Sequence, residues 1–216
     1  MSLIIIFYLY THIYEKTSDK LIKREYMTYQ FKIQIKGITK PPVWRRVLVP
    51  DTYTFLQFHQ VIQYAFNWDD YHLFDFTDKM YDMNVRISEP NEEDDFYPVK
   101  TQDAAKVKLK TFFGKDTSKK LLYLYDFGDS WYHTITLEAV LDEKILKPRC
   151  LAGKGACPPE DCGGVYGYEQ MKEVFREEPD GEEAMEYREW LGMDEDENWD
   201  PNLFNLDVTN DDLALL

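Results

Sequence analysis

The sequence predicts an α+β fold, a single domain in which a largely antiparallel or mixed sheet packs against a few helices. Residues 29–36 and 132–141 alternate apolar and polar side chains, which is typical of half-buried strands. Residues 55–66 carry apolar side chains at helical spacing. Strands and helices do not alternate regularly along the chain, which argues against a doubly wound parallel sheet. At 216 residues the chain is long enough to bury the core of one domain.

Residues 1–26 are expected to lie outside this domain, which should span residues 27–216. The apolar run 3–10 is well short of the roughly 20 residues that a membrane helix needs. It lacks the preceding basic region and the following cleavage site of a secretory signal. We therefore expect a cytoplasmic protein with no membrane segment. Met27 stands directly before the patterned sequence, so residues 1–26 are either an extension or a misassigned start.

The first two strands are expected at residues 29–36 and 43–49. Gly37 ends the first, and Pro41-Pro42 separates it from the second. Arg45 and Arg46 are neighbours in the second strand, so their side chains must point to opposite faces of the sheet. The arginine on the covered face is expected to pair with a carboxylate, because burying an unpaired guanidinium costs several kcal/mol.

A helix is expected to begin after Thr54, which forms a capping box with Gln57. His59 lies on the apolar face of this helix, and we interpret it as a hydrogen-bonded core histidine. Residues 67–70 end the helix, and residues 71–76 alternate again as a strand.

The second half of the chain contributes a hairpin and two helices. Residues 121–127 are apolar and aromatic enough for a central strand, and residues 132–141 are its expected partner. The acidic run 92–95 is interpreted as an exposed loop. Helices are expected near 168–175 and 184–191, the second ended by Gly192, while Asn210 is expected to cap a final turn.

Charge is distributed unevenly along the chain. The protein has 40 acidic and 25 basic residues, a net charge of −15, and residues 155–216 contain 19 of the acidic and 3 of the basic ones. This charge repels phosphate, so direct binding to nucleic acid or to anionic membranes is not expected. The acidic third from about residue 155 is either a solvated helical surface or a face for a basic protein partner.

Two polar loops hold the candidate functional residues. The first, residues 126–133, surrounds a hairpin turn, and the second, residues 150–164, is rich in proline and glycine. Their charged, thiol and imidazole side chains are Asp126, Asp129, His133, Cys150, Cys157, Glu160, Asp161 and Cys162. No nucleotide-binding loop, dinucleotide fingerprint, serine-hydrolase elbow or zinc-protease helix occurs, so those chemistries lack their signatures.

Three interpretations of these loops remain open. In the first, the cysteines pack as small apolar side chains and the carboxylates accept backbone N–H bonds. In the second, Cys150, Cys157, Cys162 and His133 form a tetrahedral zinc site, although this spacing differs from the usual paired knuckle. In the third, the carboxylates and Arg45 or Arg46 line a pocket that performs acid–base chemistry or holds magnesium. No cofactor is the first expectation, and zinc or magnesium is the alternative.

Five segments together resemble the plasmid pRiA4b ORF-three-like family. They are residues 41–47 (PPVWRRV), His59, Trp68 with His72-Leu73 and Phe76, residues 125–133 (YDFGDSWYH), and residues 158–168 (PPEDCGGVYGY). The resemblance extends from about Tyr29 to Asn210. It implies an α+β domain, often encoded on plasmids or mobile elements, with no established biochemical activity.

The resemblance also implies that several motif positions share one site. These positions are Arg46, Asp126, Asp129, Trp131, His133, Glu160, Asp161 and Cys162. The first function that we expect is a non-enzymatic protein-binding module with a link to mobile elements. The alternative is a metal-dependent or carboxylate-dependent hydrolase that uses the 126–133 and 150–164 loops.

Overall fold

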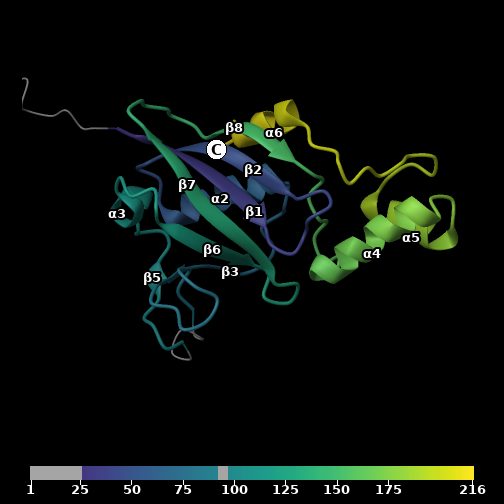
Figure 1. The fold of residues 1–216 in the computed structure, drawn as a ribbon, viewed down its shortest axis with the longest axis horizontal. Helices are drawn as coiled ribbons and strands as arrows, with labels where there is room; N and C mark the ends of the chain where they lie inside the picture. The colour runs from purple at the N-terminus through teal and green to yellow at the C-terminus, as the bar shows by residue number, and fades with distance from the viewer. Residues whose placement is uncertain (1–25, 92–96) are drawn as a thin grey trace, which may run out of the picture.

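An eight-stranded sheet forms the centre of the molecule (Figure 1). This computed structural model describes residues 26–91 and 97–216. The strand order is β5-β4-β3-β6-β7-β1-β2-β8, and neighbouring strands are antiparallel except for the parallel pair β4 and β5. The strands are β1 (Thr28–Ile35), β2 (Trp44–Pro50), β3 (Phe74–Thr77), β4 (Arg86–Ser88), β5 (Gln102–Asp103), β6 (Lys120–Tyr125), β7 (Trp131–Leu141) and β8 (Arg149–Lys154). The predicted α+β class with a mixed sheet is confirmed.

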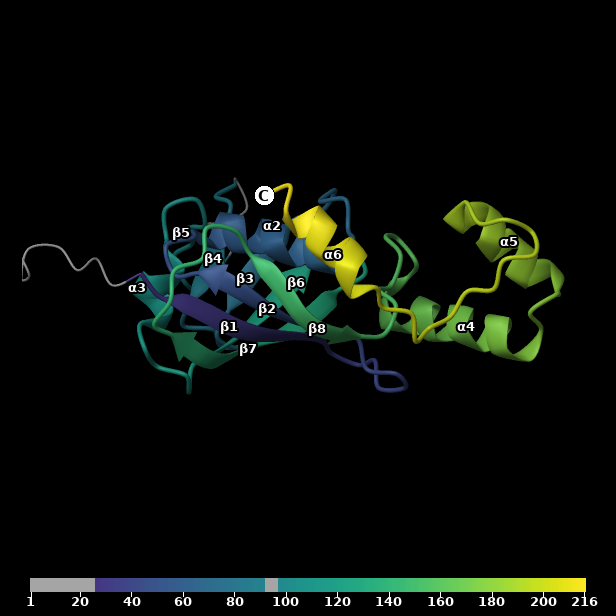
Figure 2. The same cartoon turned by 90° about the horizontal axis from the view of Figure 1, so that it is seen from above.

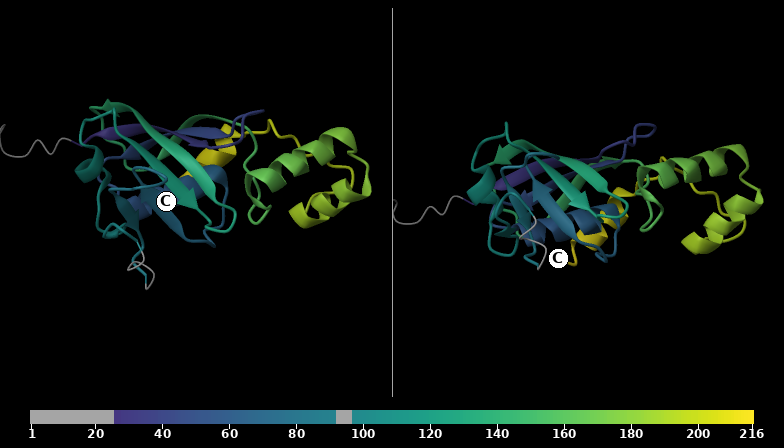
Figure 3. Two further views of the ribbon diagram at one scale, coloured as in Figure 1. Left: turned by 60° about the horizontal axis from the view of Figure 1, so that its bottom comes forward. Right: turned by 90° about the horizontal axis from the view of Figure 1, so that it is seen from below.

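The helices divide the molecule into two parts. They are α2 (Phe55–Phe66), α3 (Leu109–Phe113), α4 (Gly164–Glu177), α5 (Glu182–Leu191) and α6 (Leu206–Leu213). Helices α2 and α6 lie side by side over one face of the sheet (Figure 2). Helices α4 and α5 pack against each other and project beyond one end of it (Figure 3). We call the sheet with α2, α3 and α6 the body, and α4, α5 and residues 192–202 the arm.

Strict alternation along β1 builds the core of the body. Tyr29, Phe31, Ile33 and Ile35 are fully buried, as the sequence pattern predicts. Phe31 packs against Phe58 of α2 with ring centroids 4.7 Å apart. Aromatic rings supply much of this core, because each buries a large apolar surface and packs edge to face or offset with its neighbours.

Local capping defines α2, as predicted. The Thr54 side chain accepts a hydrogen bond from the Gln57 amide, and the Gln57 side chain accepts one from the Thr54 amide. His59 is a buried, hydrogen-bonded histidine: its Nδ1 lies 2.8 Å from the Tyr123 hydroxyl and its Nε2 lies 2.6 Å from Asp70 Oδ1. The sequence-based interpretation of His59 is therefore confirmed.

Arg45 is the buried arginine of β2, but its partners are not the predicted carboxylate. Its guanidinium donates to the backbone carbonyls of Ala65, Trp44, Lys154 and Gly155 at 2.9–3.1 Å. It also lies over the Phe66 and Phe204 rings, at 5.1 and 4.4 Å from their centroids. Four carbonyl dipoles and two ring faces thus replace the expected ion pair.

Two further expectations differ from the structure, and two lie at least partly outside the described residues. Cys150 belongs to the edge strand β8 and not to a loop, because β8 pairs with β2. Asn205, not Asn210, caps the last helix, and Asn210 instead binds the backbone of Cys150. The extension was predicted over residues 1–26, of which 1–25 lie outside the described residues, and so does the loop predicted at 92–95. No helix in the described ranges is long and apolar enough to cross a membrane.

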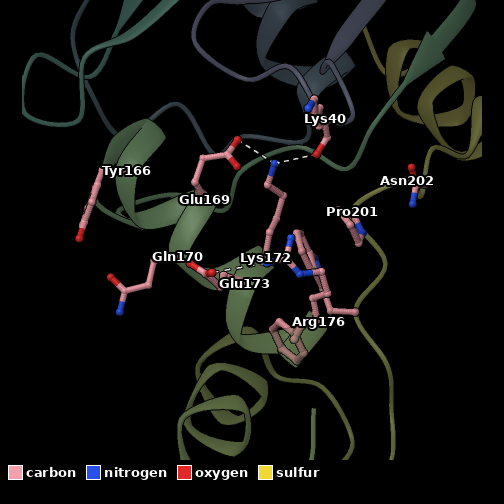
Figure 4. Close-up of a pocket in the computed structure, with 11 residues that line it drawn as sticks. Lys40, Tyr166, Glu169, Gln170, Lys172, Glu173, Arg176, Pro201 and Asn202 are labelled. Carbon is pink, nitrogen blue, oxygen red and sulfur yellow. Dashed lines mark hydrogen bonds and ion pairs between the residues drawn. The ribbon is translucent and has the colours of Figure 1, made fainter. Parts of the chain in front are cut away.

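The two ends of the arm meet where it joins the body. The Ala156 amide donates to the Pro201 carbonyl at 3.0 Å, so the outgoing and returning chains are paired. The Tyr168 hydroxyl donates to the Ala156 carbonyl at 2.8 Å, and Lys172 Nζ donates to the Lys40 carbonyl at 3.0 Å. A pocket of about 680 Å³ lies between α4, the turn that carries Lys40 and residues 199–202 (Figure 4).

Candidate functional site

Three carboxylates and one imidazole from three loops converge between the body and the arm. His72 comes from the loop before β3, Asp126 follows β6, and Glu160 and Asp161 precede α4. The His72 Nε2 atom lies 3.0 Å from Asp161 Oδ1, 3.7 Å from Asp126 Oδ2 and 3.9 Å from Glu160 Oε2. We call these four residues the His72 cluster.

The backbone at Asp126 and Asp161 turns both carboxylates toward His72. Both residues adopt left-handed conformations, with φ of 54° and 55°, which aspartate tolerates better than most side chains. Asp126 Oδ1 accepts the Gly128 amide at 2.8 Å, which leaves Oδ2 facing the imidazole. The Asp126 amide donates to the Leu73 carbonyl at 3.0 Å and so holds the His72 loop against the end of β6.

Glu160 is fixed by two hydrogen bonds to one of its oxygens. Its Oε1 accepts from the Tyr125 hydroxyl and from the Asp69 amide, both at 2.9 Å. The second oxygen, Oε2, therefore points toward His72. Burial raises the pKa of the Glu160 carboxyl above its usual value. The carboxylate is oriented before any ligand arrives.

Two buried atoms of the cluster form no hydrogen bond within the described residues. They are His72 Nε2 and Glu160 Oε2. The imidazole nitrogen is close enough to Asp161 Oδ1 for an ion pair, but the two do not make a hydrogen bond. A buried polar atom without a partner costs about 1–3 kcal/mol. A positively charged ligand between these two atoms would give each of them a partner.

The geometry of the cluster suits a metal ion. His72, Asp126 and Asp161 each offer one ligand atom, and these three atoms lie within 4.8 Å of one another. In the described ranges this is the one group of three or more possible metal ligands. Ligand atoms around a single ion with bonds of roughly 2.0–2.2 Å are separated by about 3–4.5 Å. Imidazole with carboxylates suits zinc, manganese or iron better than magnesium, which prefers oxygen ligands alone.

One side of the cluster faces solvent. The Asp126 side chain is only 8% exposed and the Glu160 side chain 15%, whereas the Asp161 side chain is 67% exposed. An ion held here would contact protein ligands on its inner side. Its outer side would remain accessible to water or to another ligand.

The structure brings together three of the sequence-predicted site residues and adds one. Asp126, Glu160 and Asp161 join the cluster. His72 was assigned to a strand from residue 71, but β3 begins only at Phe74. The polar turn at residues 67–70, which ends α2, was the signal in the sequence that could have placed His72 in a loop.

Asp129 contacts the same junction without facing His72. Its Oδ2 accepts the Gly163 amide at 3.0 Å, which joins the hairpin turn to the start of α4. Gly163 and Gly164 have φ of 86° and 68°, and a Cβ on Gly164 would lie 2.6 Å from the Asp129 carbonyl oxygen. Asp129 therefore positions the loop that carries Glu160 and Asp161.

Trp131, His133 and Arg46 lie elsewhere. Trp131 and His133 are fully buried beneath α2, where the His133 ring is perpendicular to Phe66 and Trp68 at centroid distances of 5.1 and 5.2 Å. Burial lowers the pKa of His133 to about 4, which keeps the imidazole neutral. Arg46 points to the opposite face of the sheet from Arg45, where its Nε lies 2.6 Å from Glu138 Oε2.

The structure does not bring the three cysteines and His133 into a metal-binding group within the described ranges. Cys150 is buried in β8, where its thiol contacts the Ala152 carbonyl. Burial raises the pKa of Cys157 well above its usual value and that of Cys162 to about 12. The candidate ligands are accordingly oxygen and imidazole groups.

Known proteins match this chain over most of its length. The family model for the plasmid pRiA4b ORF-3-like protein matches residues 27–208. An uncharacterized protein, y4hQ, from Sinorhizobium fredii is 36% identical over 176 residues, which cover 81% of this chain and 87% of the relative.

A solved structure has the same fold. It is the crystal structure of a protein of unknown function, MM3350, from Methanosarcina mazei Go1, with 40% identity and a TM-score of 0.71. The match covers 87% of this chain and 98% of that one. The descriptions of these relatives state no activity, ligand or partner. The chain thus belongs to the plasmid pRiA4b ORF-3-like family.

Proposed function

We propose that this protein is a protein-binding module whose arm is held in place by a divalent metal cation bound at the His72 cluster. The observation that carries the proposal is the convergence of His72, Asp126 and Asp161 ligand atoms within 4.8 Å of one another. The unpartnered atoms His72 Nε2 and Glu160 Oε2 support it, because a cation between them would satisfy both.

The position of the cluster connects the metal to the arm. Asp161 lies three residues before α4, whereas His72 and Asp126 belong to the body. A cation bound to all three would cross-link the end of the body to the start of the arm. Metal binding would therefore stabilise the orientation of α4 and α5, whose outer surface is the acidic face available to a basic partner.

The first test is metal content and thermal stability. Protein purified without an affinity tag under reducing conditions should contain one zinc, manganese or iron ion per chain by mass spectrometry. With the metal at about 100 times its Kd, a strong chelator should lower Tm by roughly 5–10 °C. His72→Ala and Asp161→Asn should abolish both the metal and the chelator effect.

A matched control makes this test specific. Asp196→Asn removes one exposed carboxylate from the same acidic third of the chain, outside the cluster. It should leave metal content and the chelator-induced shift unchanged. A protein that takes up none of these metals by titration calorimetry, or an Asp196→Asn variant that loses the metal as His72→Ala does, would contradict the proposal.

A second candidate function is metal-dependent hydrolysis. The exposure of Asp161 favours it, because catalytic metal sites keep an open position on the solvent side. A cation held by His72, Asp126 and Asp161 would lower the pKa of a coordinated water and so would supply a nucleophile near neutral pH. The test is turnover of p-nitrophenyl acetate and p-nitrophenyl phosphate by metal-loaded protein. Rates that are the same in wild type and in His72→Ala would eliminate this candidate.

A further inference from the structure

One face of α5 combines the exposed indole of Trp190 and the half-buried ring of Tyr187 with carboxylates. Glu183, Glu186, Tyr187 and Trp190 follow helical spacing and together line a hollow of about 260 Å³. The Trp190 side chain is 48% exposed. Small-molecule sites are roughly 300–1,000 Å³. A hollow of this size therefore suits a single side chain of a larger partner. We call these four residues the α5 face.

The carboxylates of this face are not neutralised by the protein itself. In the described part of the chain, neither Glu183 nor Glu186 has a basic side chain within ion-pair distance. The three basic residues after position 155 are engaged elsewhere. Lys172 pairs with Glu169 and Arg176 with Glu173 and Glu177, while Arg188 is buried and donates to the Glu197 carbonyl.

A second acidic hollow adjoins the first and shares Glu183 with it. It measures about 230 Å³ and is lined at its rim by glutamates of α4 and of the α4–α5 turn: Glu173, Glu177 and Glu178. Because Arg176 already pairs with Glu173 and Glu177, Glu178 is the rim carboxylate that would face a second positive side chain of the same segment. Phosphate-bearing partners are repelled by the same charge.

We infer that the α5 face binds an arginine-bearing segment of a partner protein, with a guanidinium placed over Trp190 and between Glu183 and Glu186. Arginine fits better than lysine because its planar, weakly hydrated head stacks on an indole while it donates to carboxylates in the ring plane. An apolar partner fits poorly, because it would bury the two carboxylates without pairing them. This inference rests on the proposed protein-binding function and names the partner chemistry.

The experiment measures binding of a short synthetic peptide in which arginines alternate with serines. The peptide is fluorescently labelled, and its anisotropy is followed at about 0.15 M salt. The matched ligand is the same peptide with citrulline in place of arginine, which keeps the shape and removes the charge. The arginine peptide should bind and the citrulline peptide should not. Binding of the two peptides with equal affinity would overturn the inference.

Protein variants locate the binding. Trp190→Ala and Glu186→Gln should each weaken binding roughly fivefold to tenfold. Asp196→Asn makes the same change of charge outside the face and should weaken binding less than about twofold. Because Trp190 and Glu186 are surface residues, circular dichroism should show wild-type helix content in both variants. Equal weakening by Asp196→Asn and Glu186→Gln would mean that charge attraction is not localised, and would overturn the inference.

The inference and the proposed metal site fail separately. Trp190→Ala should bind metal as the wild type does, because the α5 face lies outside the His72 cluster. If the wild-type protein binds the arginine peptide but no metal, only the proposed metal site is contradicted. Normal metal binding with no arginine-peptide binding overturns the α5 face inference. Self-association of the chain through this face, detected by sedimentation and removed by Trp190→Ala, would also overturn it.

Discussion

The body and the arm are built on opposite principles. The body buries many aromatic and aliphatic side chains, and residues 1–154 have nearly equal numbers of acidic and basic groups. The arm has a small core around Tyr168, Phe175 and Trp199 and carries most of the excess negative charge. We therefore expect the stability of the body to depend mainly on core packing, and the stability of the arm to depend mainly on polar contacts. The His72 cluster lies where the two meet.

The largest expected effect comes from the aromatic core of the body. Phe58→Ala removes a fully buried ring that packs against Phe31 and Phe76. It should lower the free energy of unfolding by about 3–5 kcal/mol, through lost burial and the cavity that remains. Urea denaturation followed by circular dichroism measures this. A loss below about 1 kcal/mol would show that packing in the body is loose and would remove the contrast with the arm.

The second effect is an acid sensitivity that belongs to the body alone. The folded state holds the pKa of His133 at about 4, against the ordinary value of 6.5. Between these values the unfolded chain binds a proton that the folded chain excludes, so the free energy of unfolding falls as pH decreases from 6.5 to 4. The loss should reach roughly 3 kcal/mol near pH 4.

His133→Phe isolates this contribution. Phenylalanine fits a site already lined by rings such as Phe66 and Trp68, and it does not titrate. Urea titrations at neutral pH and near the lower end of the window should show a smaller loss for the variant than for the wild type. Equal losses in both proteins would mean that His133 is protonated in the folded state.

A third, intermediate effect should be confined to the arm. A Cβ on Gly167 would lie only 1.8 Å from the Cys162 carbonyl oxygen, so Gly167→Ala must displace the loop before α4. We expect a cost of about 1–3 kcal/mol. Hydrogen exchange should show faster opening of α4 and α5 while β1 and β7 stay protected. Tyr166→Ala, at an 82% exposed position of the same helix, is the control and should leave exchange unchanged.

The smallest effect is expected on the face of the sheet away from α2. Arg46 and Glu138 form two contacts, Nε to Oε2 at 2.6 Å and Nη2 to Oε1 at 2.9 Å, but both side chains are partly exposed. Arg46→Ala should change the free energy of unfolding by about 0–1 kcal/mol, less at high salt. If the free energy of unfolding instead fell by more than about 2 kcal/mol at every salt concentration, the pair would contribute to the stability of the body as a buried ion pair does.

The parts of the fold that could be predicted from sequence are those fixed by neighbours along the chain. The α2 capping box joins residues three apart, and the alternation of β1 is visible within eight residues. Strand β8 was not predicted because its sequence does not alternate, and it exists by pairing with β2 about a hundred residues earlier. The two-residue strand β5 and the short α3 carry too little pattern to recognise.

The candidate site follows the same rule. Asp126, Glu160 and Asp161 could be singled out because each stands in a polar turn rich in proline or glycine. His72 could not be joined to them, because the contact depends on where the loop before β3 meets the end of β6. His133 was included because it follows Asp129 closely in sequence, but strand alternation turns its side chain into the core.

The hydrogen bond between Ala156 and Pro201 brings the two ends of the arm together. The chain leaves the body after β8 and returns at nearly the same point to build α6, so the arm is an insertion with adjacent ends. Excising it and closing the gap with a short turn should leave α6 covering β8 and α2. The arm could then be replaced by that of a relative while the sheet, α2 and α6 are retained.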